Sequence, residues 1–244
     1  IANTKFALKS EQSGVDAFVA EGFEAGGHNG REETTTFCLI PLVKKAIDIP
    51  LIAAGGIATG KQMLAAMILG ADGVQIGSRF IASIESSAHE SFKNSVLNTE
   101  EGGTMLTLKE LTPVRLIKNA FYQKLEKAYE DEATPEQLTN LLGKGRAKKG
   151  MFEGDLIEGE LEIGQISGLF EDIKSAKEII DEMIQDFEIA KNEIQQNELK
   201  KDYFVSIELV SAPIVESADV ILLAIKPQDF EDLNKELQGR IKLD

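Results

Sequence analysis

The sequence contains a single cysteine, Cys38, and no tryptophan. One cysteine cannot form a disulfide within the chain, and it cannot supply the several thiolates of a structural zinc site. We therefore expect no metal centre. Such sparse use of cysteine is typical of proteins from a reducing compartment, and it predicts a cytoplasmic location.

Basic residues are scarce as well. The chain has 26 Lys and Arg residues against 41 Asp and Glu residues, which gives a formal net charge of -15. Binding the phosphates of a nucleic acid requires clustered cations on one face of a protein, so this balance argues against a nucleic-acid partner. The single basic cluster, GKGRAKKG at 143–150, is predicted to be a solvated loop.

Long apolar runs are also missing from the sequence. No run reaches the roughly 20 residues of a membrane-spanning helix, and no charged-then-apolar secretory leader opens the chain, so we expect no membrane partner. The chain begins at Ile1 without methionine, and residues 1–14 resemble a helix that is already under way. These two features predict a truncated N-terminus.

The residues that are present favour a globular α/β protein. Hydrophobic residues make up 43% of the 244 residues, which is enough to bury the core of one large domain or two modest ones. The first 80 residues repeat a helix closed by glycine, a short apolar strand and a loop of small residues, with strands within 13–22, 47–56 and 69–78. Apolar strands that alternate with helices predict βαβ units and a parallel sheet.

Helix starts are marked by three capping boxes: TGKQ at 59–62, TPEQ at 134–137 and SAKE at 175–178. Apolar residues at helical spacing predict a further amphipathic helix over 113–130. The pattern changes near 199–202, where we place a domain boundary.

Two loops of unusually small residues follow consecutive predicted strands: AAGGIATG at 53–60 and QIGSRF at 75–80. Amides of glycine-rich loops approach anions closely, a following helix N-terminus adds favourable partial charge, and barrels bind phosphate after their last two strands. Either loop alone would be read as a tight turn between strand and helix. The two together favour a phosphate site.

His28 lies in the segment AEGFEAGGHNG, after the first predicted strand. Imidazole changes its charge near neutral pH, so histidine suits general acid–base chemistry. A histidine in a glycine-rich loop is otherwise an ordinary surface residue, but the neighbouring phosphate loops favour a chemical role for His28. His89, in ESSAHE, is expected to cap or pack at a helix end.

Seven segments follow one another along the chain in this order: AEGFEAGGHNG, PLIAAGGIATG, GADGVQIGSRF, ESSAHE, GTMLTLKELTPVRLIKN, GRAKKGMFEGDL and GELEIGQISGL. In this order and spacing they resemble the flavin-dependent nitronate monooxygenase family, which includes the flavin-type enoyl-ACP reductases. The resemblance covers residues 1–197.

The resemblance implies an α/β fold in which part of a (β/α)8 TIM barrel holds FMN non-covalently, with a small helical domain over the strand ends. It makes His28 the catalytic histidine, and it places GQISGL, around Gln165, at the mouth of the site. A whole barrel needs about 250 residues, so we expect only its last three strands here, with the first half absent. The implied FMN-binding residues are Gly26, Gly55, Gly56, Gln75, Gly77 and Ser78.

The tail has a resemblance of its own. SADVILLAIKPQDFEDL, at 217–233, resembles the strand of the pyrroline-5-carboxylate reductase dinucleotide-binding domain whose end, here 224–227, lies along NADP. The glycine-rich loop that binds the pyrophosphate in such domains is missing here, and an ordinary buried strand and helix is the alternative.

We accordingly expect three parts: a C-terminal portion of an FMN-binding barrel over 1–100, a helical cap domain that returns to the barrel over 101–198, and a partial Rossmann-like α/β segment over 199–244. The cofactor is expected to be FMN, with NAD(P)H as a second candidate. The substrate is expected to be a small molecule or an acyl thioester, and a homodimer is the assembly to consider.

Three functions are compatible with these expectations. The first is oxidation of a nitronate or a similar carbanionic substrate by oxygen through FMN. The second is reduction of an enoyl thioester by NAD(P)H through FMN in fatty-acid synthesis. The third is a non-catalytic truncated or fused fragment that only self-associates through an unpaired strand edge.

Overall fold

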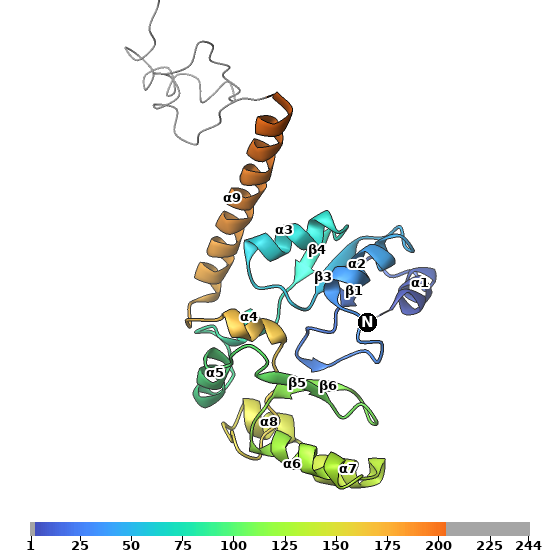
Figure 1. Ribbon diagram of the computed structural model, residues 1–244, viewed down its shortest axis with the longest axis vertical. Helices are drawn as coiled ribbons and strands as arrows, with labels where there is room; N and C mark the ends of the chain where they lie inside the picture. Colours follow the sequence, from blue (N-terminus) through green and yellow to red (C-terminus); the bar gives the residue numbers. More distant parts are fainter. Residues whose placement is uncertain (1–2, 204–244) are drawn as a thin grey trace, which may run out of the picture. The chain divides into compact units, whose positions relative to one another are not determined.

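The computed structural model describes residues 3–203 (Figure 1). The chain divides into two compact units, Ile1–Ala190 and Lys191–Asp244, and the first unit holds both sheets. The strand and helix predicted within 203–244, and nearly all of the Rossmann-like segment predicted over 199–244, lie outside the described residues. The domain limits at 100 and 198 remain predictions.

Helix α1 (Thr4–Gln12) opens the described chain. The Asn3 side chain accepts a hydrogen bond from the Phe6 amide at 2.9 Å and so caps the helix. Asparagine is among the residues that best satisfy the free amides of a first turn. The expectation of a helix already under way at Ile1 is therefore wrong, because this helix begins at Thr4.

Three strands form the predicted parallel sheet, in the order β1-β3-β4. The register pairs Phe18 with Leu51 and Ala54 with Gln75. A helix lies between each strand and the next, as βαβ units require. These elements are β1 (Phe18–Glu21), α2 (Thr36–Lys44), β3 (Leu51–Ala54), α3 (Gly60–Ile68) and β4 (Gly73–Gln75).

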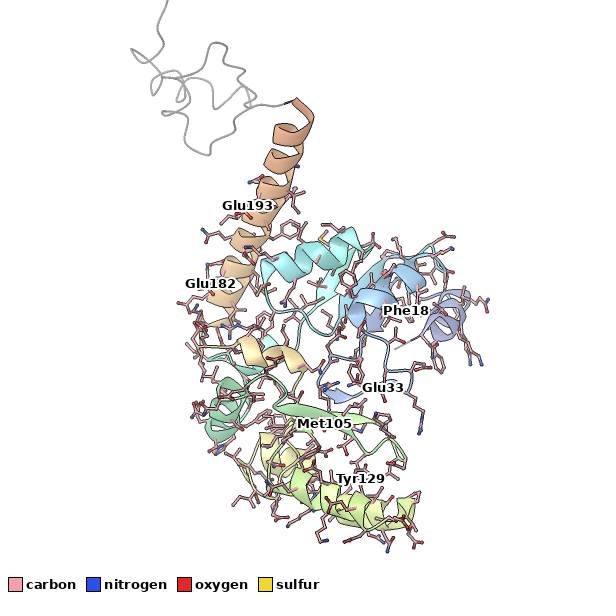
Figure 2. All side chains as sticks on the ribbon, in the orientation of Figure 1. Phe18, Glu33, Met105, Tyr129, Glu182 and Glu193 are labelled. Atoms are coloured by element: carbon pink, nitrogen blue, oxygen red, sulfur yellow. The ribbon has the colours of Figure 1, made fainter. Side chains whose placement is uncertain are left out.

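The core of this part is built from small and branched side chains of the sheet and its helices. Phe18, labelled in Figure 2, is 3% exposed at the start of β1. Leu39, Ile40 and Val43 of α2 pack into the same cluster. One face of the sheet enters this core through Phe18, Ala20, Leu51 and Ala53, whereas Val19 and Ile52, on the other face, are only half-buried.

A second sheet is antiparallel, in the order β2-β6-β5, with β2 at Gly27–His28, β5 at Thr104–Thr107 and β6 at Val114–Ile117. The helix predicted over 113–130 is therefore wrong in its first part. All four residues of β6 are buried in the sheet, and α6 (Ala120–Glu130) begins only after Asn119, whose side chain accepts from the Tyr122 amide. Strand pairing and an N-cap residue override the helical spacing there.

Helices α6, α7 (Pro135–Leu142) and α8 (Arg146–Met151) lie next to this sheet (Figure 1). The expected helical cap is thus a mixed structure that includes an antiparallel sheet. The predicted solvated loop at 143–150 is also wrong, because most of it is α8. The Arg146 guanidinium packs over the Phe121 ring, 4.2 Å from its centroid.

The remaining elements connect the two sheets and end the described chain. They are α4 (Ser78–Ile81), α5 (Glu90–Leu97), the short 3-10 helix η1 (Gln165–Leu169) and α9 (Ala176–Tyr203). All three predicted capping boxes are confirmed, at Thr59 and Thr134 and, for α9, through reciprocal bonds between Ser175 and Glu178. His89 caps α5, as expected, by accepting from the Ser91 amide.

Candidate active site

The C-terminal ends of the three parallel strands border a cavity of about 340 Å³. The segment that leads into η1 forms another wall of this cavity through Glu162, Ile163 and Ile166. We call this space the strand-end cavity. All six residues expected to bind FMN line it: Gly26, Gly55, Gly56, Gln75, Gly77 and Ser78.

The two glycine loops present backbone amides at this edge of the sheet. Gly55 and Gly56 have φ angles of 92° and 69°, a region that disfavours side chains. A Cβ added at Gly77 would meet nothing within 4 Å. Among the residues that the structure describes, the amides of Gly55, Gly56 and Gly77 donate to no protein acceptor.

Ser78 links the second loop to the opposite wall. Its Oγ accepts a hydrogen bond from the Gly164 amide at 3.0 Å. Within residues 3–203 its hydroxyl proton has no acceptor, so it remains available to a ligand oxygen. A hydroxyl that accepts one bond and still donates another suits an anion site.

The N-terminus of α3 offers an anion fewer free amides than the sequence suggests. Its Gln62 amide donates to Thr59 Oγ1, and its Lys61 amide donates to the Asp186 carboxylate at 2.9 Å. These protein acceptors already satisfy two of the amides that a phosphate would use. The first loop therefore offers an anion chiefly the amides of 55–57.

A network centred on Glu24 joins three walls of the cavity. The Glu24 carboxylate accepts from the Thr36 amide at 2.9 Å, and the Thr36 hydroxyl lies 2.9 Å from the Gly55 carbonyl oxygen. The Glu24 carbonyl accepts from the Gln165 amide at 2.9 Å. The loops after β1 and β3 are thus tied to each other and to η1. Gln165 itself is exposed and does not line the cavity, whereas its neighbour Ile166 does.

Two adjacent glycines hold the loop after β1 against this wall. A Cβ at Gly26 would lie 2.4 Å from the Ile163 carbonyl carbon, and one at Gly27 would lie 2.6 Å from Glu162 Oε2. Gly26 therefore has a packing reason to be glycine, independent of any ligand. The Glu162 carboxylate rests against Gly27, directly before His28.

His28 does not line the strand-end cavity. It is exposed in β2 and borders two neighbouring cavities, one that shares Glu162 with the strand-end cavity and one that shares Glu21. The loop thus places the imidazole beside the six residues expected to bind FMN rather than among them.

Carboxyl groups in this region are perturbed by burial. Desolvation raises the pKa of Glu21 and of Glu162, and for Glu162 the charge of His28 acts in the opposite direction. Burial, with the neighbouring Glu162 charge, raises the pKa of Glu160 to about 7. Perturbed carboxyls that border a cleft are common in functional sites.

Sequence reasoning missed these carboxylates. The segment ELEI at 160–163 alternates acidic with apolar residues, and this period of two indicates an extended segment with one polar face. Leu161 and Ile163 are indeed buried, at 1% and 2% exposure. Reading that alternation would have placed Glu160 and Glu162 together.

No group of three or more His, Cys, Asp or Glu side chains within residues 3–203 is arranged to hold a metal ion. None of the helices described is both long and apolar enough to cross a membrane.

Comparison with known proteins agrees with this architecture. A probable nitronate monooxygenase from Staphylococcus saprophyticus is 39% identical over 159 residues, which are 59% of this chain and 44% of that protein. The relative from Staphylococcus haemolyticus is 39% identical over 161 residues, covering 60% and 45%. The chain spans less than half the length of these curated relatives.

Solved structures extend the likeness over most of the chain. FabK from Thermotoga maritima matches with a TM-score of 0.74 and 38% identity, over 80% of this chain and 61% of that one. A nitroalkane oxidase from Streptomyces ansochromogenes matches with a TM-score of 0.65 and 29% identity, over 80% and 58%. These matches confirm the expected α/β fold with part of a (β/α)8 barrel.

The family model for nitronate monooxygenase matches residues 1–186, which include both glycine loops, His28 and the Glu160–Glu162 segment. The chain belongs to the nitronate monooxygenase family.

Proposed function

We propose that this chain is part of an FMN-dependent oxidoreductase that oxidises nitronates or similar carbanionic substrates with oxygen. The observation that carries the proposal is that all six residues expected from sequence to bind FMN line one cavity at the strand ends. FMN, when bound, supplies the chemistry of accepting electrons from a carbanion and passing them to oxygen.

The residues of the strand-end cavity fit such a cofactor. The volume of about 340 Å³ lies in the usual range of ligand pockets, about 300–1,000 Å³. The amides of Gly55, Gly56 and Gly77 and the Ser78 hydroxyl would hold the phosphate. Ile57, Ile81 and Met151 supply apolar surface. No Lys or Arg among the described residues lines this cavity, so the phosphate would depend on backbone donors.

His28 would act on the substrate rather than on the cofactor. Its exposed imidazole, beside the cavity, can accept a proton at a ring nitrogen from the carbon acid or donate a hydrogen bond to the resulting anion. Its place outside the strand-end cavity supports this division of roles.

Enoyl-thioester reduction with NAD(P)H is the second candidate. The observation that favours it is the TM-score of 0.74 and 38% identity to FabK from Thermotoga maritima, both higher than for the nitroalkane oxidase. The cavity bordered by Glu21 and His28, about 470 Å³ in volume, would be the entrance for the thioester.

One pair of assays separates the two candidates. Chain loaded with FMN is mixed with a nitronate and oxygen consumption is followed; a second sample receives NADPH and then a crotonyl thioester in a stopped-flow spectrometer. We expect oxygen consumption with the nitronate. Rapid flavin bleaching by NADPH and reoxidation by the thioester, with no response to the nitronate, would replace the first candidate by the second.

The role of His28 is tested by His28→Asn, with His89→Asn as the matched control because asparagine can still cap α5. We expect His28→Asn to lower turnover about 100-fold or more and to leave FMN bound, whereas His89→Asn keeps both. Loss of FMN from His28→Asn alone would assign His28 to cofactor binding.

A further inference from the structure

A second cavity, of about 230 Å³, shares Glu162 with the strand-end cavity and none of the six residues expected to bind FMN. We call it the inner cavity. His28, Glu160, Glu162 and Arg146 are its charged or titratable lining residues. Its remaining lining is largely apolar, and it includes Leu108, Leu111, Val114 and Leu142.

Glu160 is the unusual member of this lining. It is only 7% exposed, and among the residues that the structure describes its carboxyl group makes no hydrogen bond or ion pair. The alternation of the ELEI segment explains its position. Leu161 and Ile163 belong to a cluster of buried residues that includes Phe92, while Glu160 and Glu162 both border the inner cavity.

Arg146 does not neutralise this carboxyl by a direct bond. Its guanidinium donates to the carbonyls of Leu141, Leu142 and Glu158, and it lies 3.3 Å from the Glu158 carboxylate. One face of its guanidinium lies over the Phe121 ring. The ionisable groups that border the cavity with Glu160 are thus Glu162, His28 and Arg146, and the Arg146 charge acts against the rise in the Glu160 pKa.

We propose that Glu160 and Glu162 form a proton relay that carries protons away from His28 through the inner cavity. The relay rests on the function proposed above. After His28 has taken a proton from the carbon acid, the N–H bond of the imidazolium breaks, the Glu162 carboxylate takes up that proton, and Glu162 passes it to the Glu160 carboxylate, where a new O–H bond forms. Only protons move, and no electron is exchanged.

The dimensions and acidities suit this transfer. A cavity of about 230 Å³ is several times the roughly 30 Å³ that a water occupies, and its two carboxyls, imidazole and Thr112 hydroxyl are partners for bridging waters. Burial raises the pKa of Glu160 to about 7, so Glu160 can take up and release a proton near neutrality. Glu162 borders both this cavity and the strand-end cavity.

The relay is tested first by carboxyl ¹³C NMR titration of the chain, which needs neither flavin nor turnover. Glu160 should titrate well above the usual range of a solvent-exposed glutamate, because burial raises its pKa to about 7. His28→Asn should raise the titration midpoint of Glu162, because the His28 charge lowers the pKa of that carboxyl. His89→Asn should leave it unchanged. Titration of Glu160 in the usual range of an exposed glutamate, or no response of Glu162 to His28→Asn, would overturn the relay.

Turnover of the FMN-loaded chain provides the second readout. Glu160→Gln should lower kcat about tenfold or more at unchanged KM and alter the pH profile, while Glu130→Gln changes neither. An unchanged kcat and pH profile in Glu160→Gln would refute the relay and leave the proposed function intact. Failure of the wild-type chain to bind FMN, with the NMR coupling present, would refute the proposed function instead.

Discussion

At the scale of single residues, Arg115 shows how the loop that carries His28 is held. Its side chain is 1% exposed in β6, and its guanidinium stacks 4.5 Å from the Phe23 ring centroid. Nη2 donates to the Phe23 carbonyl at 2.8 Å, and Nη1 lies 3.3 Å from Thr104 Oγ1. Burial lowers the pKa of Arg115, and the charges of Glu24 and Glu33 oppose this. A buried cation thus anchors the chain between β1 and β2.

Replacing Arg115 should therefore destabilise the fold. Arg115→Leu leaves the Phe23 carbonyl without its donors and removes the stacked contact, which should cost about 2 kcal/mol. Arg115→Lys should cost less, because a charge and one donor remain. Urea unfolding followed by circular dichroism measures both. A loss below about 0.5 kcal/mol for the leucine variant, the range of ordinary surface changes, would show that the anchor contributes little.

Glu160 should make stability depend on pH. Its pKa is raised from 4.5 to about 7 in the folded chain, so between these values the folded state binds more protons than the unfolded state. Stability contributed by this group is then lost as pH rises from about 4.5 to about 7, by up to about 3 kcal/mol.

Glu160→Gln removes that titration. Relative to wild type, the variant should be more stable at pH 8 than at pH 5 by about 2–3 kcal/mol, whereas Glu130→Gln should show no such difference. Urea unfolding at the two pH values gives the comparison. An equal effect of Glu160→Gln at both would mean that Glu160 titrates as an exposed carboxyl does.

The sequence predicts which residues gather at the strand ends, because the two glycine loops follow consecutive strands of one parallel sheet. Gly55, Gly56, Gly77 and Ser78 converge on one cavity, as the order of strands and loops requires. Arg115 could not be found in this way, because its burial depends on segments distant in sequence. The alternation of ELEI places Glu160 beside Glu162, but the burial of Glu160 also depends on distant segments.

At the scale of elements, helix starts were the most predictable feature. The Thr134 box is complete: Thr134 Oγ1 accepts from the Gln137 amide at 3.3 Å, and the Gln137 side chain accepts from the Thr134 amide at 2.7 Å. These contacts are local in sequence, so the motif TPEQ contains all of their determinants.

Thr134→Ala should destabilise the chain by about 1 kcal/mol, because the Gln137 amide in the first turn of α7 loses its partner. Thr139→Ala, in the same helix, is the control, since its hydroxyl bonds only a carbonyl that the helix already contains. Thermal unfolding of the two variants makes the comparison. Equal losses would indicate that the capping box does not stabilise α7.

Elements that depend on distant partners were harder to predict. Val114 and Ile117 fit a helical spacing with Phe121 and Leu125, yet they lie in β6, between β2 and β5. Only pairing with strands far along the chain decides this. Asn119, which caps α6, was the local sign that the helix starts later. Arg146 likewise lies in a helix that the sequence did not predict. Its guanidinium packs over the Phe121 ring and donates to carbonyl oxygens outside that helix, and local sequence does not indicate these contacts.

At the scale of the whole molecule, the first unit combines a parallel sheet, whose strand ends border one cavity, with an antiparallel sheet that supplies His28. The segment 160–166 borders the strand-end cavity and pairs with the antiparallel sheet, through the bridge between Leu116 and Glu162. The alternation of strands and helices made the first sheet predictable from sequence. The second sheet joins β2 to residues almost 90 positions away, as the pairing of Gly27 with Arg115 shows.

The most direct test is a comparison of FMN and riboflavin binding to this chain, followed by quenching of flavin fluorescence. The account predicts that FMN binds more tightly, because only FMN carries the phosphate that the strand-end cavity would hold. Ser78→Ala should weaken FMN binding about tenfold and leave riboflavin unchanged, as expected for one hydrogen bond to a charged group, and Ser78→Thr should restore it. Equal affinity for the two flavins, or no response of FMN to Ser78→Ala, would contradict the proposed phosphate site.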